Sequence, residues 1–295
     1  MSLDRTDGPE DAPRVEDPPG QDSEAPAPRR IPNLGHALLF VGFTGIVLIV
    51  FQTILLALGR SPAAVHGGEI TVQHPKLQIA TMASTYLTVL LAAWFFYPAV
   101  WQRTFLDGVR WQWATARRQA GRLVALGFLL GAMMQVVTYF ITPPKTPPID
   151  EFFLTAADAW LITVFGTVVA PVFEELCFRG FLVPAFAIAY DWLSLPRTPA
   201  ARTRWQTTMT ITPAALIFSA VLSSIFFALL HAQQVEHIWA ALLGLFSVSL
   251  VLTFVRVKTR SVAASVVVHG AYNFLVFLAV MIATGGYRHL ERMNR

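Results

Sequence analysis

Seven runs of apolar residues, each long enough to cross a lipid bilayer as a helix, dominate this sequence. A helix needs about 20 mostly apolar residues to span the hydrocarbon core. The runs cover 34–58, 77–101, 123–141, 160–190, 213–230, 237–255 and 262–284. Helices satisfy all their backbone hydrogen bonds internally, as a lipid environment requires. We therefore predict an all-α protein, a polytopic transmembrane helical bundle of about seven spans, with a disordered N-terminal tail.

The composition agrees with a membrane protein and excludes several other classes. Hydrophobic residues make up 55% of the chain, charged residues only 14%, and the mean hydropathy is +0.53. The net charge of +4 is small and the basic residues lie between the apolar runs, which argues against a nucleic-acid partner. The single cysteine, Cys177, excludes an intramolecular disulfide and a zinc site built from several thiolates.

The chain divides into four parts by composition. Residues 1–32 are rich in acids and prolines, which predicts a disordered tail and excludes a signal peptide. Residues 33–148 hold three N-terminal transmembrane helices, 149–285 form a helical core with the strongly polar groups, and 286–295 form a C-terminal tail. The run over 160–190 exceeds one perpendicular span, so we expect Pro171 and Pro184 to kink or divide it.

The positions of arginine and lysine indicate the orientation. Basic residues in short loops accumulate on the cytoplasmic side. Those before the first run, between the second and third, and after the fourth and sixth all share one side if the N-terminus is cytoplasmic. Arg288, Arg292 and Arg295 are the exceptions. We predict an integral membrane protein with a cytoplasmic N-terminus, in a bacterial inner membrane.

Two carboxylates and an arginine interrupt the fourth run, in the stretch PVFEELCFRG over 171–180. Ionisable groups inside a membrane are costly and usually functional. In a helix, Glu175 and Arg179 stand at i and i+4, where their side chains can pair. Glu174 is turned away by about 100° and is left to face something else.

Later runs supply the polar side chains that these charges can meet. His231 ends the fifth run, and His269 and Asn273 stand at i and i+4 in the seventh. A carboxylate and a histidine could take a proton from water while a second histidine and an amide donate to an oxyanion. The same groups could bind a divalent metal such as zinc. The residues alone do not decide between these chemistries.

The spacing of these residues resembles the three-motif signature of a known family. Glu174-Glu175-x-x-x-Arg179, Phe227-x-x-x-His231 and His269-x-x-x-Asn273 follow one another on separate apolar runs. This pattern is similar to that of the CPBP family, the CAAX-prenyl-protease and bacteriocin-processing membrane proteins, including Rce1-like CAAX endopeptidases and the Abi proteins. The resemblance covers about 160–284.

The resemblance implies an intramembrane endopeptidase. It assigns water activation to Glu174 with His231, oxyanion stabilisation to His269 and Asn273, and positioning of the site to Glu175 and Arg179. No cofactor is required on this reading. A metal-dependent form would use Glu174, His231 and His269 as ligands. The expected partners are the lipid bilayer and a membrane protein or peptide substrate, a leader or an anchored tail rather than a prenylated CAAX protein.

Other readings of the same residues stay open at this stage. The polar set could bind a partner without cutting it, in a non-catalytic immunity factor or scaffold protein. The two glutamates and Arg179 could also be a charge network that holds the helices together. A proton-coupled transporter is weakened by the lack of an evident inverted repeat. Cys177 could be a nucleophile, but a buried cysteine is more often a small apolar side chain. His231 ends its run, whereas His269 comes early in a run of the same direction, so we expect the two side chains at different depths in the membrane. They could still meet if the helices start at different heights, if they tilt strongly, or if the sixth run does not fully cross.

Overall fold

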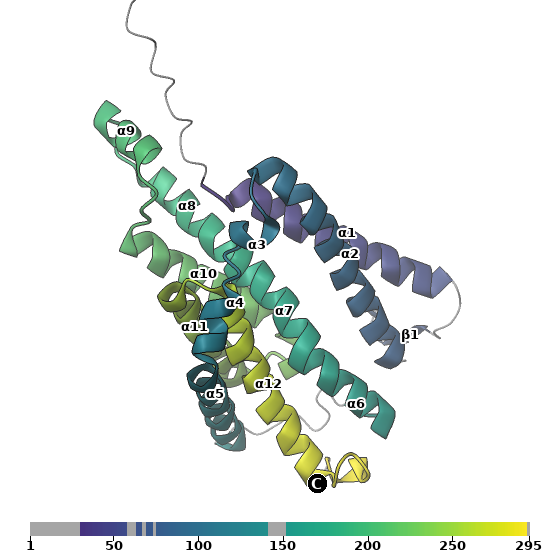
Figure 1. Cartoon of the computed structure of the whole chain (residues 1–295). Helices are drawn as coiled ribbons and strands as arrows, with labels where there is room; N and C mark the ends of the chain where they lie inside the picture. Colours follow the sequence, from purple (N-terminus) through teal and green to yellow (C-terminus); the bar gives the residue numbers. More distant parts are fainter. Residues whose placement is uncertain (1–29, 58–62, 67–68, 73–74, 141–151, 294–295) are drawn as a thin grey trace, which may run out of the picture.

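The computed structural model describes residues 30–57, 63–66, 69–72, 75–140 and 152–293 (Figure 1). Most of the predicted disordered tail, residues 1–29, lies outside the described residues.

Seven helices in the described chain are long and apolar enough to cross a membrane. They are α1 (Leu34–Ala57), α2 (Pro75–Trp101), α5 (Ala120–Phe140), a composite helix over Ala156–Leu193, α10 (Pro213–Leu230), α11 (Trp239–Thr259) and α12 (Val262–Ala283). Large apolar side chains face outward, with Phe95 74% and Leu230 70% exposed, as expected where lipid and not water surrounds the helices. The predicted all-α bundle with about seven spans is confirmed, and the chain is an integral membrane protein.

Short elements connect the spans. The described strands form one antiparallel hairpin, β1 (Ala63–His66) with β2 (Glu69–Val72), in which Ala63 faces Val72. The other short elements are helices: α3 (Phe105–Gly108), α4 (Trp113–Arg118), α9 (Pro199–Thr207), η4 (Gln233–Val235) and η5 (Leu290–Arg292). The hairpin joins α1 to α2 and leaves the helical architecture unchanged.

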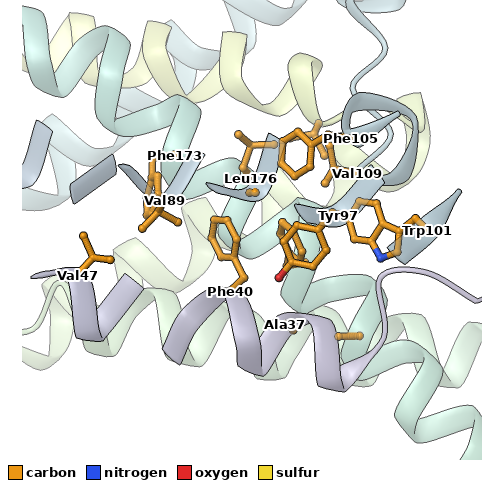
Figure 2. Packing of buried hydrophobic residues seen from close by; sticks show 14 residues of the cluster. Ala37, Phe40, Val47, Val89, Tyr97, Trp101, Phe105, Val109, Phe173 and Leu176 are labelled. Atoms are coloured by element: carbon orange, nitrogen blue, oxygen red, sulfur yellow. The ribbon is translucent and has the colours of Figure 1, made fainter. Parts of the chain in front are cut away.

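The composite helix runs through the centre of the bundle (Figure 1). The pair α1 and α2 packs on one side of it, and α5, α10, α11 and α12 gather on the other. On the α1 side, aromatic rings fill the space, and the rings of Phe40 and Phe181 stack with 4.3 Å between their centroids. Figure 2 shows Phe40, Phe173, Tyr97 and Trp101 in this cluster. Because Phe173 and Phe181 flank the charged stretch, this packing fixes the rotation of the helix that carries it.

On the other side, α5 and α12 approach each other closely at a glycine. A Cβ atom on Gly127 would lie 2.5 Å from the carbonyl oxygen of Val268 and 2.6 Å from the Cβ of Ala271. Small residues allow this kind of close helix packing in membranes, where van der Waals contact replaces the hydrophobic effect. The contact holds the part of α12 that carries His269.

The composite helix contains five segments without a break. They are α6 (Ala156–Val164), the π-helix η2 (Phe165–Val169), α7 (Ala170–Glu175), the π-helix η3 (Leu176–Leu182) and α8 (Val183–Leu193). In the π segments the N–H of Ala170 donates to the oxygen of Phe165 and that of Val183 to Phe178, five residues back. Pro171 and Pro184 each lie in the first turn after a π segment. The prolines therefore coincide with widened turns and do not divide the helix.

Hydrogen bonds place the basic loops together at one end of the bundle. The N–H of Val262, between α11 and α12, donates to the oxygen of Arg110, between α2 and α5, over 3.1 Å. Likewise Arg30, just before α1, donates from Nη2 to the oxygens of Trp205 and Thr208, in the connection from α8 to α10. The segments predicted to share a membrane side from their charge thus contact one another in pairs.

Helix α10 starts further out than α12, which resolves the expected difference in depth. With a rise of about 1.5 Å per residue, α10 climbs about 27 Å before it reaches His231, whereas α12 climbs about 10 Å to His269. The chain supports this offset, since α8 and α9 project beyond the other helices and α10 begins beside them (Figure 1). The end of α10 consequently reaches the level of the first third of α12.

Candidate active site

The two glutamates lie in a short α-helical segment between two π-helical ones. Glu174 and Glu175 are the last residues of α7, with η2 before them and η3 after them. A π turn inserts extra backbone, changes the direction of the side chains that follow, and is frequent at functional sites. The widened turns on either side therefore determine the direction in which the two carboxylates point.

Glu175, Arg179 and Ser249 form a closed half of the site, with no access to the surroundings. The side chains of Glu175 and Arg179 are 0% exposed, and Arg179 Nη1 donates to Glu175 Oε1 over 2.9 Å. Arg179 Nη2 donates to the backbone oxygen of Ser249 over 2.8 Å and to its Oγ over 2.7 Å. The predicted pair at i and i+4 is present, and it also ties the composite helix to α11.

Glu174, His231 and the Nε2 edge of His269 form the open half. Glu174 Oε2 lies 3.8 Å from His231 Nε2 and 3.8 Å from His269 Nε2. The side chains of Glu174 and His231 are 20% and 18% exposed, compared with 4% for His269. Distances of 3.8 Å exceed a direct hydrogen bond and leave the carboxylate and both ring nitrogens free to share a water or a substrate atom.

The partners of the histidine Nδ1 atoms determine which ring nitrogen faces Glu174. His231 Nδ1 lies 2.7 Å from the backbone oxygen of Phe227, and His269 Nδ1 lies 2.9 Å from Glu175 Oε1. A carbonyl and a carboxylate accept hydrogen bonds, so each Nδ1 carries a hydrogen. Nε2 of each ring therefore faces the open half, with a free lone pair when the ring is neutral and with an N–H when the ring is protonated.

Phe227 packs against several members of the site. Its ring stacks on His231 with 4.5 Å between the centroids and meets the ring of His269 edge-on at 5.9 Å. The guanidinium carbon of Arg179 lies 5.1 Å from the centre of the same ring. This first residue of the second motif thus links the two halves of the site and excludes water from the closed one.

Asn273 makes a different contact from the other five predicted residues. Its Nδ2 donates to the backbone oxygen of Gly166, in η2, over 2.7 Å. Among the described residues, no hydrogen bond or ion pair joins Asn273 to the glutamates, the arginine or the histidines. The amide carries two N–H groups, so this bond to Gly166 leaves one of them for another acceptor.

Cys177 belongs to the apolar packing and not to the polar group. It is half-buried and packs against the cluster on the α1 side of the composite helix. Within the described part of the chain no hydrogen bond connects it to a histidine. This position agrees with the interpretation of Cys177 as a small apolar side chain.

The sequence suggested Glu174, His231 and His269 as metal ligands, and in the structure these would bind through Glu174 Oε2 and the two histidine Nε2 atoms. Among the residues that the structure describes, no group of three or more His, Cys, Asp or Glu side chains is arranged to hold a metal ion. We therefore derive no step through a metal.

Sequence reasoning missed two partners of the site, Ser249 and the oxygen of Gly166. A serine in an apolar span is a weak signal, because it usually bonds within its own helix or to a neighbour. The oxygen of Gly166 accepts from a side chain because it lies in a π segment, and composition does not mark such segments. The sequence signal that could have indicated the π segments is the proline that follows each of them, Pro171 and Pro184.

Comparisons with known proteins bear on the part of the chain that holds this site. Residues 156–275 match the family model described as type II CAAX prenyl endopeptidase, Rce1-like. A relative, the UPF0177 protein YbdI of Lactococcus lactis subsp. lactis (strain IL1403), is 24% identical over 160 residues, which cover 52% of this chain and 71% of that protein. No solved structure matches the chain significantly. The matched segment is less than half of the chain and holds all three motifs, so this part of the chain is similar to the Rce1-like CAAX endopeptidases.

Proposed function

We propose that the protein is an intramembrane endopeptidase that hydrolyses a peptide bond in a membrane-associated protein or peptide. One observation carries the proposal: Glu174 Oε2 lies 3.8 Å from the Nε2 atoms of both histidines inside the segment that matches the Rce1-like family. A carboxylate with two ring nitrogens around one small space is suited to hold and activate a water molecule.

In the proposed reaction Glu174 is the general base. Water bound between Glu174 and His231 loses a proton to the carboxylate as its oxygen attacks the scissile carbonyl carbon. The carbonyl oxygen becomes an oxyanion, which accepts hydrogen bonds from His269 Nε2 and from the second N–H of Asn273. For this step His269 carries a proton on both nitrogens. The carbon–nitrogen bond then breaks, and the proton on Glu174 passes to the leaving amine.

The closed half would position the open half. Glu175 Oε1 accepts from His269 Nδ1 and so directs Nε2 toward Glu174, while Arg179 holds Glu175 in place. A carboxylate behind a histidine fixes the tautomer and the direction of the ring, as in other hydrolytic sites. Glu175 and Arg179 are therefore assigned as positioning residues.

The reaction would take place inside the membrane, close to one surface. His269 lies about 10 Å from the start of α12, and that start adjoins the basic loops. If these loops are cytoplasmic, as proposed from their charge, the N-terminus is cytoplasmic and the cleavage site lies near the cytoplasmic leaflet of a bacterial inner membrane. A substrate would approach from the side of Glu174 and His231, the partly exposed members of the site.

The test is a comparison of protein N-termini in cells that carry the wild type, Glu174→Gln or Glu236→Gln. Glu236 is an exposed carboxylate in the connection that follows His231, and its substitution is the matched control. We expect membrane-associated precursors to accumulate uncleaved with Glu174→Gln and to be processed with Glu236→Gln. Normal processing with a folded Glu174→Gln variant would overturn the assignment and favour the non-catalytic alternative, an immunity or scaffold protein.

A chelator distinguishes the two chemistries of hydrolysis. We expect cleavage by the purified protein to continue after treatment with a strong zinc chelator, because the proposed steps use protein side chains alone. Loss of cleavage that added zinc restores would instead support the metal-dependent form with Glu174, His231 and His269 as ligands. The endopeptidase function would stand in both cases.

A further inference from the structure

Arg256, in the last turn of α11, is buried without a counter-charge. The residue is 9% exposed, and its Nε atom is inaccessible and has no hydrogen-bond acceptor. Within the described part of the chain, no carboxylate lies in ion-pair range of its guanidinium. Buried charges in proteins are normally paired, because the cost of removing them from water is large. Arg256 thus lacks the anion that its burial requires.

A second arginine, Arg110, lies in the loop that contacts the turn after α11. The segment of Arg110 is held against the turn between α11 and α12, since the N–H of Val262 donates to the oxygen of Arg110 over 3.1 Å and Ser261 Oγ donates to the oxygen of Gln112 over 3.0 Å. Arg256 lies in the last turn of α11, directly before the turn that Arg110 contacts, so the two positive charges are at the same end of the bundle. Arg110 also has a left-handed backbone conformation, with φ of 59°, which is uncommon outside glycine and persists only where the surroundings fix it.

Nothing within the same segment neutralises the two arginines. Asp107 is the acidic residue of this loop, and it is exposed, with Oδ2 accepting from Thr104 Oγ1 over 2.6 Å. The pair therefore presents two positive charges at the end of the membrane-spanning helices. Trp113, 56% exposed and next to this segment, is the kind of side chain that marks the headgroup level of a membrane.

We propose that Arg110 and Arg256 bind the phosphate group of an anionic phospholipid. A phosphate offers several oxygens to guanidinium groups and supplies the missing negative charge. A lipid is favoured over a free phosphate ion because the pair lies at the membrane surface, where basic pockets between helices collect anionic headgroups. The lipid would brace the loop between α2 and α5 against α11 and α12. This site is separate from Glu174 and does not depend on the proposed peptidase activity.

The test measures thermal unfolding of the purified full chain in detergent, with phosphatidylglycerol or phosphatidylcholine added. A ligand that binds the folded state raises the unfolding temperature. We expect phosphatidylglycerol to raise it in the wild type, and Arg110→Gln and Arg256→Gln to require about tenfold more of this lipid for the same shift, from the loss of a charge-assisted hydrogen bond. Arg103→Gln, an exposed arginine of the same loop, is the control that should respond like the wild type.

Two further arms decide the source of the anion. Inorganic phosphate and glycerol phosphate, at the same concentration as the lipid, should shift the unfolding temperature much less. An equal shift with soluble phosphate would overturn the assignment to a lipid headgroup. An unchanged lipid response in Arg110→Gln would overturn the site itself, and this variant keeps the test informative if Arg256→Gln fails to fold, because the side chain of Arg110 is exposed.

Discussion

The two halves of the candidate site use neighbouring glutamates in opposite ways. In the closed half, Glu175 is fully buried and Oε1 meets Arg179 Nη1 and His269 Nδ1, each at 2.9 Å. In the open half, Glu174 is partly exposed, and its Oε2 lies 3.8 Å from the Nε2 atoms of His231 and His269. Two identical side chains, adjacent in the chain, thus differ: Glu175 is buried with short contacts at one oxygen, whereas Glu174 is partly exposed with longer contacts.

This difference gives the two glutamates different roles, one in holding the structure of the site and one in proton transfer. A carboxylate with two short charged contacts at one oxygen is committed to those partners and holds helices and a histidine ring in place. A carboxylate with longer contacts can exchange protons with a water or substrate that enters the space. The contrast predicts that substitutions in the closed half change stability first, and that substitutions in the open half change cleavage first.

The largest effect on stability is expected from Arg179→Met. Removal of the guanidinium leaves the buried carboxylate of Glu175 with His269 Nδ1 as its remaining partner and cuts the link to Ser249 in α11. The loss of one partner of a buried ion pair costs about 3–5 kcal/mol. Denaturant unfolding in detergent micelles measures this change in the free energy of unfolding.

Arg179→Lys is the control for Arg179→Met. Lysine keeps the charge but lacks the planar fork that reaches Glu175 and Ser249 at the same time. We expect an intermediate loss of stability. Wild-type stability in Arg179→Met would contradict the description of the closed half as the support of the site.

A large effect on cleavage with little effect on stability is expected from His231→Asn. His231 ends α10, is partly exposed, and has one hydrogen bond from its ring, to the oxygen of Phe227. Loss of a proton-handling side chain lowers rates by about 10²–10⁴-fold. The cleavage rate and the unfolding temperature of the same preparation test this expectation, with His237→Asn, an exposed histidine nearby, as the control. Equal losses of stability and cleavage would show that His231 is structural.

The smallest effect is expected from Ser249→Ala. The hydroxyl is one of two acceptors for Arg179 Nη2, and the backbone oxygen of the same residue remains. Loss of one hydrogen bond to a charged group costs about 1.5–3 kcal/mol at most, and the remaining acceptor reduces this. Unfolding measurements should place this variant between the wild type and Arg179→Lys. A cleavage defect larger than that of His231→Asn would show that the division into two halves is wrong.

Much of the fold follows from the sequence, because the apolar runs are long and a bilayer allows few alternatives to helices. The pairing of Glu175 with Arg179 also follows, since a spacing of four residues puts them on one helical face. The gathering of His231 and His269 around Glu174 was not accessible from spacing. It was suggested by the motif resemblance, and the roles of these residues remain a proposal.

Other features could not be predicted because they depend on packing between helices. The π turns around α7 have no compositional signal beyond the prolines that follow them. The contact of Asn273 with Gly166 depends on such a turn, so the sequence could not distinguish it from a contact with the histidines. The depth of His231 depends on how far α8 and α10 extend beyond the other helices, which is set by contacts distant in the chain.

The most direct test of the account compares purified Glu174→Gln with purified Glu175→Gln. The free energy of unfolding is measured for each variant, and the cleavage rate is measured for the same preparation with a precursor found in cells as the substrate. Glu174→Gln should keep the wild-type unfolding free energy and lose cleavage by about 10²–10⁴-fold. Glu175→Gln should lose about 3–5 kcal/mol of stability. A folded Glu174→Gln protein that still cleaves at the wild-type rate would contradict the assignment of Glu174 as the general base.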